Sequence, residues 1–578
     1  MKIRRIKVAI ATGAMVFAAA FAPPPAPMYD TLLRGGTIYD GLGGAGRVGD
    51  VAIKGERIVY VGPRAPGTAT TVVDAEGLAV APGFINMLSW AVESLIADGR
   101  SLSDIRQGVT LEVFGEGDSM GPLSPEMKRL TQQRQGDVRY DVGWQSLFEY
   151  LEWLTKRGIA PNVASFVGAT TVRANVLGEK DVDPTPEQLT RMRALVAAEM
   201  RGGAMGVGSS LIYAPASYAE TPELIALVDE VARCDGMYIS HMRSEGDRLI
   251  EAIDELISIA RQTGARAEIY HFKQAGKENW PKIDAAIARV EAARAGGLPI
   301  TANMYPYTMG GSGLDASMPT WVQDGGLEAW IERMKQPEIR KRLIAEMRAP
   351  GVGWENLYRA SGGAEGLIAS GFKSDRLKPL AGKTIAEIAK MRGTGPEETM
   401  MDLVIEDGSR VGILYRFMDE KNVARAVSLP WMSFGSDADS QAPEGPFLKS
   451  RPHPRAYGTF ARVLGHYARD GKRMPMAEAI RRMTSLPAAN LKLRDRGQLK
   501  VGYQADLAIF DPRTILDRST VEKPQAFATG MRHVFVNGQQ VLRNGEPTGA
   551  RPGQVVRGPG WRGWPDGGAC KPRTGRPR

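Results

Sequence analysis

The stretch MYISHMRSEGDRLIEAIDELISIARQTGARAEIYHFKQAG, residues 237–276, contains two short apolar runs with an amphipathic segment between them. The runs MYIS and AEIY have the length and residue types of buried strands, and the segment between them repeats its apolar residues at helical spacing. A strand, a helix and a strand in this order predict a parallel βαβ unit. Each apolar run leads directly into a histidine, His241 or His271.

The same alternation extends over residues 82–494, in runs such as GVTLEVFGEG (108–117), VASFVGATT (163–171), ITANMYPY (300–307) and WMSFGSDAD (431–439). About eight such units over some 400 residues predict an α/β fold with a (β/α)8 barrel. A charged stretch around residues 310–392 reads as helical. We expect it to form an insertion over the mouth of the barrel.

The two ends of the chain have a different texture. Residues 28–81 and 495–556 contain short alternating runs separated by turns, and Asn537-Gly538 is a hairpin signal. These pieces predict one small β-sandwich domain built from both chain ends.

The formal net charge of +9 resides in the two termini. Lys2, Arg4, Arg5 and Lys7 open the chain, and the tail 557–578 holds six bases and one acid. The body between them is neutral, which argues against a nucleic-acid partner, since that would need a basic face on the folded domain. The Gly-, Pro- and Arg-rich tail predicts disorder.

The basic start is followed by a short apolar run and small residues, so residues 1–22 predict a secretory signal peptide and a periplasmic or secreted protein. An uncleaved anchor is the alternative. After cleavage no stable membrane span is expected. The chain has two cysteines, Cys234 and Cys570. They predict neither a disulfide framework nor a metal cluster.

Four polar residues follow apolar runs, at the positions where barrel enzymes keep their active sites. His241 and His271 are candidate metal ligands, with a buried core histidine as the alternative for each. Asp437 and Glu116 end similar runs, where a helix cap or a plain turn would also favour them. Two imidazoles with one or two carboxylates suit Zn²⁺, with one position open for water.

The chain also resembles the N-acyl-D-amino-acid deacylases (D-aminoacylases) of the amidohydrolase superfamily, from about residue 29 to 560. The resemblance rests on nine motifs in order: APGFIN, GVTLEVFGEG, LIYAPASYAETPEL, SHMRSEGD, HFKQAG, MYPYT, GSDADS, HPRAYGTFARVLGHY and ADLAIFDP. Together they imply a metal-dependent amidohydrolase barrel with a small β-sandwich.

The resemblance implies roles for individual residues. His241 and His271 match the family's single-histidine metal ligands, and Asp437 matches its catalytic aspartate. Tyr305 matches a tyrosine that polarises the amide carbonyl, although Tyr307 fits nearly as well. Three further residues are candidate substrate contacts: Lys273, Arg455 and Tyr213. A solvated charge is the alternative for Lys273, and simple packing is the alternative for Tyr213.

The chain departs from the family pattern at three places. Leu88 and Trp90 stand where the superfamily has a His-x-His pair, and Ala169 stands where many relatives have a histidine. Glu116 replaces a metal-binding cysteine. These departures predict one metal ion instead of two, held by Glu116, His241 and His271.

The expected activity is hydrolysis of N-acyl-(D-)amino acids by a metal-activated water, with Asp437 as general base. One alternative is a periplasmic binding or scaffold protein that kept the cleft without catalysis. Another is a dipeptidase or a hydrolase of lipid-like N-acyl amino acids, for which Leu88 and Trp90 would make the mouth apolar. The oligomeric state, acyl chain and amino-acid side chain are left open.

Overall fold

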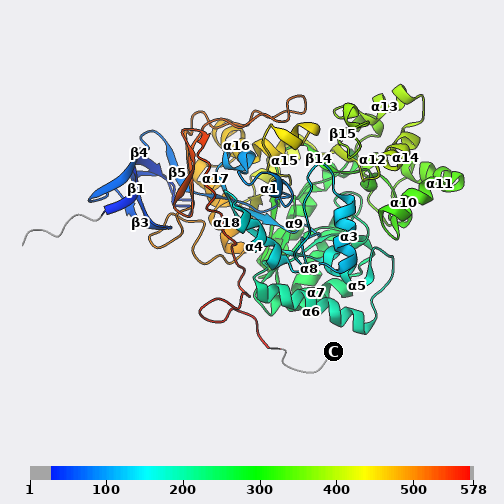
Figure 1. Ribbon diagram of the computed structural model, residues 1–578, viewed down its shortest axis with the longest axis horizontal. Coiled ribbons are helices and arrows are strands. Elements are labelled where there is room, and N and C mark those ends of the chain that lie inside the picture. The colour runs from blue at the N-terminus through cyan, green and yellow to red at the C-terminus, as the bar shows by residue number, and fades with distance from the viewer. Residues whose placement is uncertain (1–27, 573–578) are drawn as a thin grey trace, which may run out of the picture.

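The computed structural model describes residues 28–572, so the predicted signal peptide at residues 1–22 lies outside the described residues. The fold is mixed α/β, and parallel strands with helices packed against them make up its centre (Figure 1). Six strands pair in the order β17-β13-β12-β11-β10-β9, and three pair in the order β6-β7-β8. These strands are β6 (Phe84–Asn86), β7 (Val109–Phe114), β8 (Asn162–Ser165), β9 (Val167–Gly168), β10 (Gly206–Ser210), β11 (Met237–His241), β12 (Arg266–Ile269), β13 (Ile300–Met304) and β17 (Met432–Phe434).

The two sheets join at both sides. Phe166 alone separates β8 from β9, and the Met87 N–H donates to Phe434 O at 3.2 Å. A parallel bridge between Ser89 and Ala438 continues this second junction. The hydrogen-bonded strands therefore follow one another around a ring, and their carboxyl ends open on the same side.

Burial explains why these segments become strands and helices. Every residue of β7 and of β11 is buried, as expected for parallel strands that are covered on both faces. In α8 (Leu249–Thr263) the buried residues include Leu249, Ile253, Leu256 and Ala260, which share one face at helical spacing. The helix ends at Gly264, whose left-handed φ of 73° suits a residue without Cβ.

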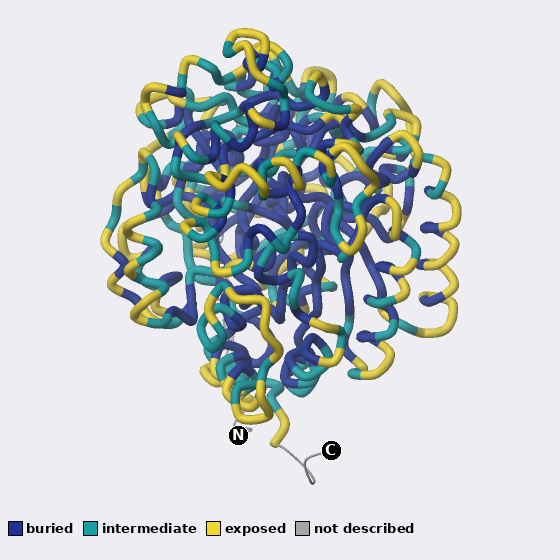
Figure 2. The backbone as a smooth tube through the Cα atoms, turned by 90° about the vertical axis from the view of Figure 1, so that its right-hand side faces the viewer, coloured by how far each residue is buried: buried dark blue, intermediate teal, exposed yellow. Residues whose placement is uncertain are grey.

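Further helices connect and cover the strands. They are α1 (Ser94–Ala97), α2 (Leu102–Ile105), α3 (Pro125–Arg134), α4 (Leu147–Arg157), α5 (Ala169–Leu177), α6 (Pro186–Gly202), α7 (Thr221–Ala232), α9 (Ile283–Ala295), α15 (Glu420–Val427), α16 (Arg455–Arg462), α17 (Met476–Met483) and α18 (Ser485–Asn490). In Figure 2 the buried segments gather in the middle of the molecule and the exposed ones lie at its periphery.

Both chain ends contribute to a nine-stranded sheet, ordered β21-β20-β19-β18-β5-β1-β2-β3 with β4 paired to β1. Its strands are β1 (Met28–Ile38), β2 (Arg47–Lys54), β3 (Arg57–Gly62), β4 (Thr68–Asp74), β5 (Ala79–Pro82), β18 (Leu507–Phe510), β19 (Met531–Val536), β20 (Gln539–Arg543) and β21 (Glu546–Pro547). The antiparallel pairing of β5 with β18 joins the two halves. In Figure 1 the blue and red strands of this sheet lie together at one end of the molecule.

The insertion is longer and less helical than predicted. Its helices are α10 (Leu327–Met334), α11 (Pro337–Arg348), α12 (Leu357–Ala360), α13 (Ile385–Arg392) and α14 (Pro396–Asp407). They accompany a three-stranded antiparallel sheet of β14 (Met309–Gly313), β16 (Gly412–Arg416) and β15 (Leu367–Gly371). Buried apolar residues of β15 and β16, such as Leu367 and Ile413, pack into a core shared with the helices, and this burial stabilises short strands that the charged composition hides.

The C-terminal tail differs from its predicted disorder where the structure describes it. Residues 557–572 contact the body: the Arg557 guanidinium lies 3.5 Å from the centre of the Phe148 ring, and Cys570 forms a disulfide with Cys234 at the end of α7. The two cysteines thus form one bridge across 336 residues, which their sequence spacing does not announce. Among the described residues, no helix has the length and apolar character needed to cross a bilayer.

Candidate active site

The candidate residues come together at the carboxyl ends of the ring strands. His241 is the last residue of β11, and the others follow a strand within a few residues: Glu116 after β7, His271 after β12, Tyr305 after β13, Asp437 after β17 and Tyr213 after β10. Arg455 opens α16. A ring of parallel strands thereby brings together residues that are far apart in sequence.

Glu116, His241 and His271 form a buried cluster. Glu116 Oε1 lies 3.0 Å from His241 Nδ1 and 2.5 Å from His271 Nε2. One ligand atom from each residue can be chosen so that all three lie within 4.8 Å of one another. Burial opposes the ionisation of Glu116, but the two imidazoles outweigh it and hold the pKa of Glu116 below its ordinary range.

This cluster fits a divalent metal ion. Ligands about 2.0–2.2 Å from one Zn²⁺ lie within roughly 4.5 Å of each other, and N/O donors suit this ion. Among the described residues, His241 Nε2 is buried without a hydrogen-bond partner, so a good ligand atom is left for an ion. From the sequence alone, Glu116 could be either a metal ligand or a turn residue. In the structure it lies next to both histidines.

Glu245 is a site residue that the sequence analysis missed. Its Oε1 lies 2.9 Å from His271 Nδ1 and 2.6 Å from Lys273 Nζ, and its Oε2 lies 3.5 Å from His241 Nε2. A carboxylate behind a metal-binding imidazole fixes the ring and its tautomer. The sequence signal that could have identified Glu245 is its position four residues after His241.

Lys273 lies in the site, but its ammonium is occupied by the protein. Nζ contacts Glu245 and lies 2.7 Å from His271 Nδ1. Burial and the Lys273 charge oppose protonation of His271, yet the Glu116 and Glu245 carboxylates raise its pKa to about 9. These contacts indicate that Lys273 supports His271. A contact between Lys273 and the substrate stays a prediction.

Asp437 lies next to Arg455 and Trp90. Its Oδ2 is 2.6 Å from Arg455 Nη1, and its Oδ1 accepts from the Trp90 indole N–H at 3.1 Å. Burial raises the pKa of Asp437 above the usual value, with Arg455 opposing the change. Both Asp437 (φ 50°) and His271 (φ 33°) hold left-handed backbone conformations, which are uncommon for residues other than glycine.

Arg455 presents an unused hydrogen-bond donor. Its side chain is 6% exposed, and its guanidinium carbon lies 4.4 Å from the centre of the Tyr305 ring. Nη1 is paired with the Asp437 carboxylate, whereas Nε is buried without an acceptor among the described residues. A buried guanidinium with a free N–H group is prepared for an anionic group from outside the protein.

The insertion contributes one wall of the site. Ser312 of β14 donates to the Tyr213 hydroxyl at 2.8 Å, and Glu355 accepts from the Glu245 N–H at 3.2 Å. A Cβ built on Gly311 would lie 3.3 Å from Arg455 Nη2, so the β14 backbone passes close to the guanidinium. Tyr213 also packs edge-on to His241, with 5.3 Å between ring centres.

The residues that depart from the family pattern have different surroundings in the structure. Leu88 is 1% exposed and belongs to the core below the site, so it does not make the mouth apolar as the sequence suggested. Trp90 is half-buried, and its indole N–H points at Glu116 Oε2 (2.9 Å) and at Asp437. Ala169 begins α5 and is buried.

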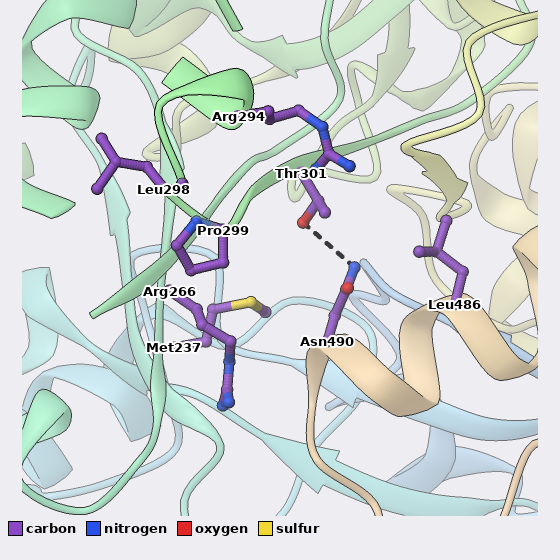
Figure 3. Close-up of a pocket in the computed structure, with 9 residues that line it drawn as sticks. Met237, Arg266, Arg294, Leu298, Pro299, Thr301, Leu486 and Asn490 are labelled. Carbon is purple, nitrogen blue, oxygen red and sulfur yellow. Dashed lines mark hydrogen bonds between the residues drawn. The ribbon is translucent and has the colours of Figure 1, made fainter. Parts of the chain in front are cut away.

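A separate pocket of about 350 Å³ opens at the other end of the strands (Figure 3). Met237 and Arg266, the first residues of β11 and β12, line it together with Arg294, Thr301 and Asn490, and Thr301 meets the Asn490 amide (Figure 3). None of the candidate active-site residues lines this pocket.

Comparison with known proteins places this geometry in a family. The model of the amidohydrolase family matches residues 71–542. D-aminoacylase from Alcaligenes xylosoxydans xylosoxydans is 32% identical over 535 residues, which cover 91% of this chain and 97% of that protein. The chain belongs to the amidohydrolase family, in its D-aminoacylase branch. This amidohydrolase is a hydrolase acting on linear amides.

Other relatives support the same family assignment. N-acyl-D-aspartate deacylase from the same organism is 31% identical, covering 91% of this amidohydrolase and 95% of that protein. The structure of N-acyl-D-glutamate deacylase from Bordetella bronchiseptica, with zinc and a phosphonate inhibitor, matches at 27% identity with a TM-score of 0.74 over 92% of this chain and all of that one. A D-aminoacylase with a binuclear metal centre, described by one-metal activation and second-metal attenuation, has the same TM-score at 30% identity and the same coverage.

Proposed function

We propose that this amidohydrolase removes the acyl group from N-acyl-D-amino acids with one divalent metal ion. The observation that carries the proposal is the buried cluster of Glu116, His241 and His271 with Asp437 beside it. The ring of strands is taken as the (β/α)8 barrel of the family, and the nine-stranded sheet as its β-sandwich.

Glu116, His241 and His271 would hold the ion, which we take to be Zn²⁺. The N/O ligand set supports this choice, and the N-acyl-D-glutamate deacylase structure contains zinc. When bound, such an ion acidifies a water molecule and polarises the carbonyl of the scissile amide. Glu245 and Lys273 would keep His271 in its orientation.

Asp437 is proposed to move the proton. Its carboxylate would accept the proton of the attacking water as the amide carbon is attacked, and would then return it to the leaving amine. Burial raises its pKa above the usual value, which favours a group that must both accept and donate a proton. Tyr305, below the Arg455 guanidinium, would donate toward the carbonyl oxygen.

Arg455 supports an amino-acid substrate. Its Nε donor, which has no partner among the described residues, would bind the α-carboxylate that remains on an N-acyl amino acid. The D configuration rests on the relatives, which are named for N-acyl-D-amino acids. Tyr213, held by Ser312, would line the same cleft.

The test is a panel of N-acyl-D- and N-acyl-L-amino acids, incubated with zinc-loaded enzyme and read as free amine. We expect about one zinc per chain and turnover of D-substrates. His241→Ala should lose both, while replacement of the exposed His466, in the segment Val463–Asp470 that follows α16, by alanine should keep both. Turnover that is unchanged in His241→Ala, or a purified enzyme that is active without a stoichiometric ion, would overturn the proposal.

We also propose that the protein is exported. The support is the basic, apolar and small-residue order of residues 1–22 and the pairing of the chain's two cysteines in a disulfide, which oxidising compartments favour. Fractionation and intact mass of the mature protein test this. A cytoplasmic protein that still carries Met1 would contradict it.

A further inference from the structure

The most informative contact outside the proposed ligand set is the indole N–H of Trp90. It lies 2.9 Å from Glu116 Oε2 and 3.1 Å from Asp437 Oδ1. These two carboxylates have different duties in the proposed function, one as a metal ligand and one as a proton acceptor. A single neutral donor therefore connects the two parts of the site.

Each carboxylate uses its other oxygen elsewhere. Glu116 Oε1 contacts both histidines, and Asp437 Oδ2 faces Arg455. Glu116 Oε2 and Asp437 Oδ1 both accept from the Trp90 N–H, and among the described residues no other hydrogen bond reaches either oxygen. Two buried carboxylates at such close quarters repel one another, so the group between them must supply positive charge or a hydrogen-bond donor.

Trp90 is held where it can do this. Its own backbone N–H donates to Ala438 O at 3.0 Å, and the Asp437 N–H donates to Leu88 O at 2.8 Å. The Ser89–Ala438 bridge lies between these bonds. Trp90 and Asp437 thus sit on two paired segments, and neither can shift along its strand without breaking that pairing.

The chemistry of indole gives this contact a second consequence. Its nitrogen carries a hydrogen and has no lone pair to offer a metal, so Trp90 cannot be a ligand. The N–H occupies the space that a cation bridging both carboxylates would take.

We propose that Trp90 is a positioning residue that bridges Glu116 and Asp437, orients Asp437 for proton transfer and excludes a second metal ion. This inference rests on the proposed single-metal function. It attributes the binding of a single ion to the Trp90 N–H, in addition to the absence of the His-x-His ligands at the first strand.

The test compares Trp90→Phe with Trp431→Phe. Phenylalanine keeps an aromatic ring at position 90 and removes the N–H. Trp431 is 3% exposed, and its indole N–H has no partner among the described residues, so its replacement controls for loss of a buried indole. Metal per chain is measured after dialysis against excess zinc, and kcat and KM are measured with the same N-acyl-D-amino acid.

We expect the natural enzyme and Trp431→Phe to bind one ion. Trp90→Phe should bind more than one, and its kcat should fall about 10- to 100-fold with little change in KM, because the proton acceptor loses its orientation. Trp90→His, whose imidazole can ligate, should bind two ions. A merely structural role would lower stability without adding an ion.

The zinc titration of the unaltered enzyme decides the matter even if Trp90→Phe does not fold. Two tightly bound ions in that enzyme would overturn the inference, as would a Trp90→Phe enzyme with unchanged kcat and one ion. Either result leaves amide turnover by the natural enzyme intact. Failure of the proposed function would instead appear as no ion or no turnover before any substitution is made.

Discussion

Replacement of Arg455 by lysine tests whether the guanidinium recognises the substrate's carboxylate. Lysine keeps a positive charge near Asp437 but loses the planar fork of N–H donors. Nε has no acceptor among the described residues, so an α-carboxylate bound by the guanidinium would lose the charge-assisted hydrogen bond from Nε in the lysine variant. Such a bond contributes about 1.5–3 kcal/mol, which is a fall in kcat/KM of roughly 10- to 150-fold.

The assay needs a second substrate, because Arg455 also lies 2.6 Å from Asp437. Kinetics with an N-acyl-D-amino acid are compared with those of its carboxamide analogue, which has no carboxylate to bind. Arg455→Lys should lose most of its kcat/KM with the acid and little with the carboxamide. Arg462→Lys, in the same helix and paired with Asp517, should change neither. Equal losses on both substrates would refute carboxylate recognition and assign Arg455 to Asp437 alone.

Three further changes test other parts of the structure. Glu245→Gln should weaken zinc binding about 10- to 100-fold in a chelator competition, because it removes the carboxylate behind His271; unchanged affinity would leave Glu245 without that role. Burial raises the pKa of Glu199 to about 7, so its ionised form opposes folding: stability present below about pH 4 is lost as the pH rises through 7, by up to about 3 kcal/mol. Glu199→Gln should therefore melt higher than the natural enzyme at pH 8 and nearly the same at pH 4, and an equal difference at both pH values would contradict this. Cys570→Ser should lower stability by about 2–5 kcal/mol and make the melting temperature insensitive to dithiothreitol; a melting temperature of the natural enzyme that dithiothreitol leaves unchanged would show that the bridge contributes nothing.

Sequence reasoning reached the mixed α/β fold because buried parallel strands announce themselves as short apolar runs. It also named residues that the structure brings together, since His241, His271 and Asp437 each follow such a run. The sequence analysis missed Glu245 because it lies in a loop. Its role becomes visible only in the structure, where it lies beside His271. The β15 and β16 strands were missed by the sequence analysis because each has only a short apolar run, which lies among charged helices.

Some departures were seen but not understood from sequence. Leu88 and Trp90 were recognised as unusual, yet residues two apart on a regular strand would share a face. Both follow the end of β6, and only the structure shows that Leu88 packs in the core while Trp90 reaches the carboxylates. The Cys234–Cys570 bridge joins residues 336 positions apart, which no spacing rule could suggest. The described part of the tail, residues 557–572, contacts the body where composition indicated disorder.

The insertion contacts residues of the candidate site at several places. Ser312 meets Tyr213, Glu355 meets the Glu245 backbone, and Gly311 passes beside Arg455, whereas the proposed metal ligands all belong to the ring. Such a division lets substrate preference change by exchange of one peripheral module while the hydrolytic chemistry is inherited intact. A library restricted to β14 and its flanking loops would therefore explore new acyl amino acids without disturbing the proposed metal ligands.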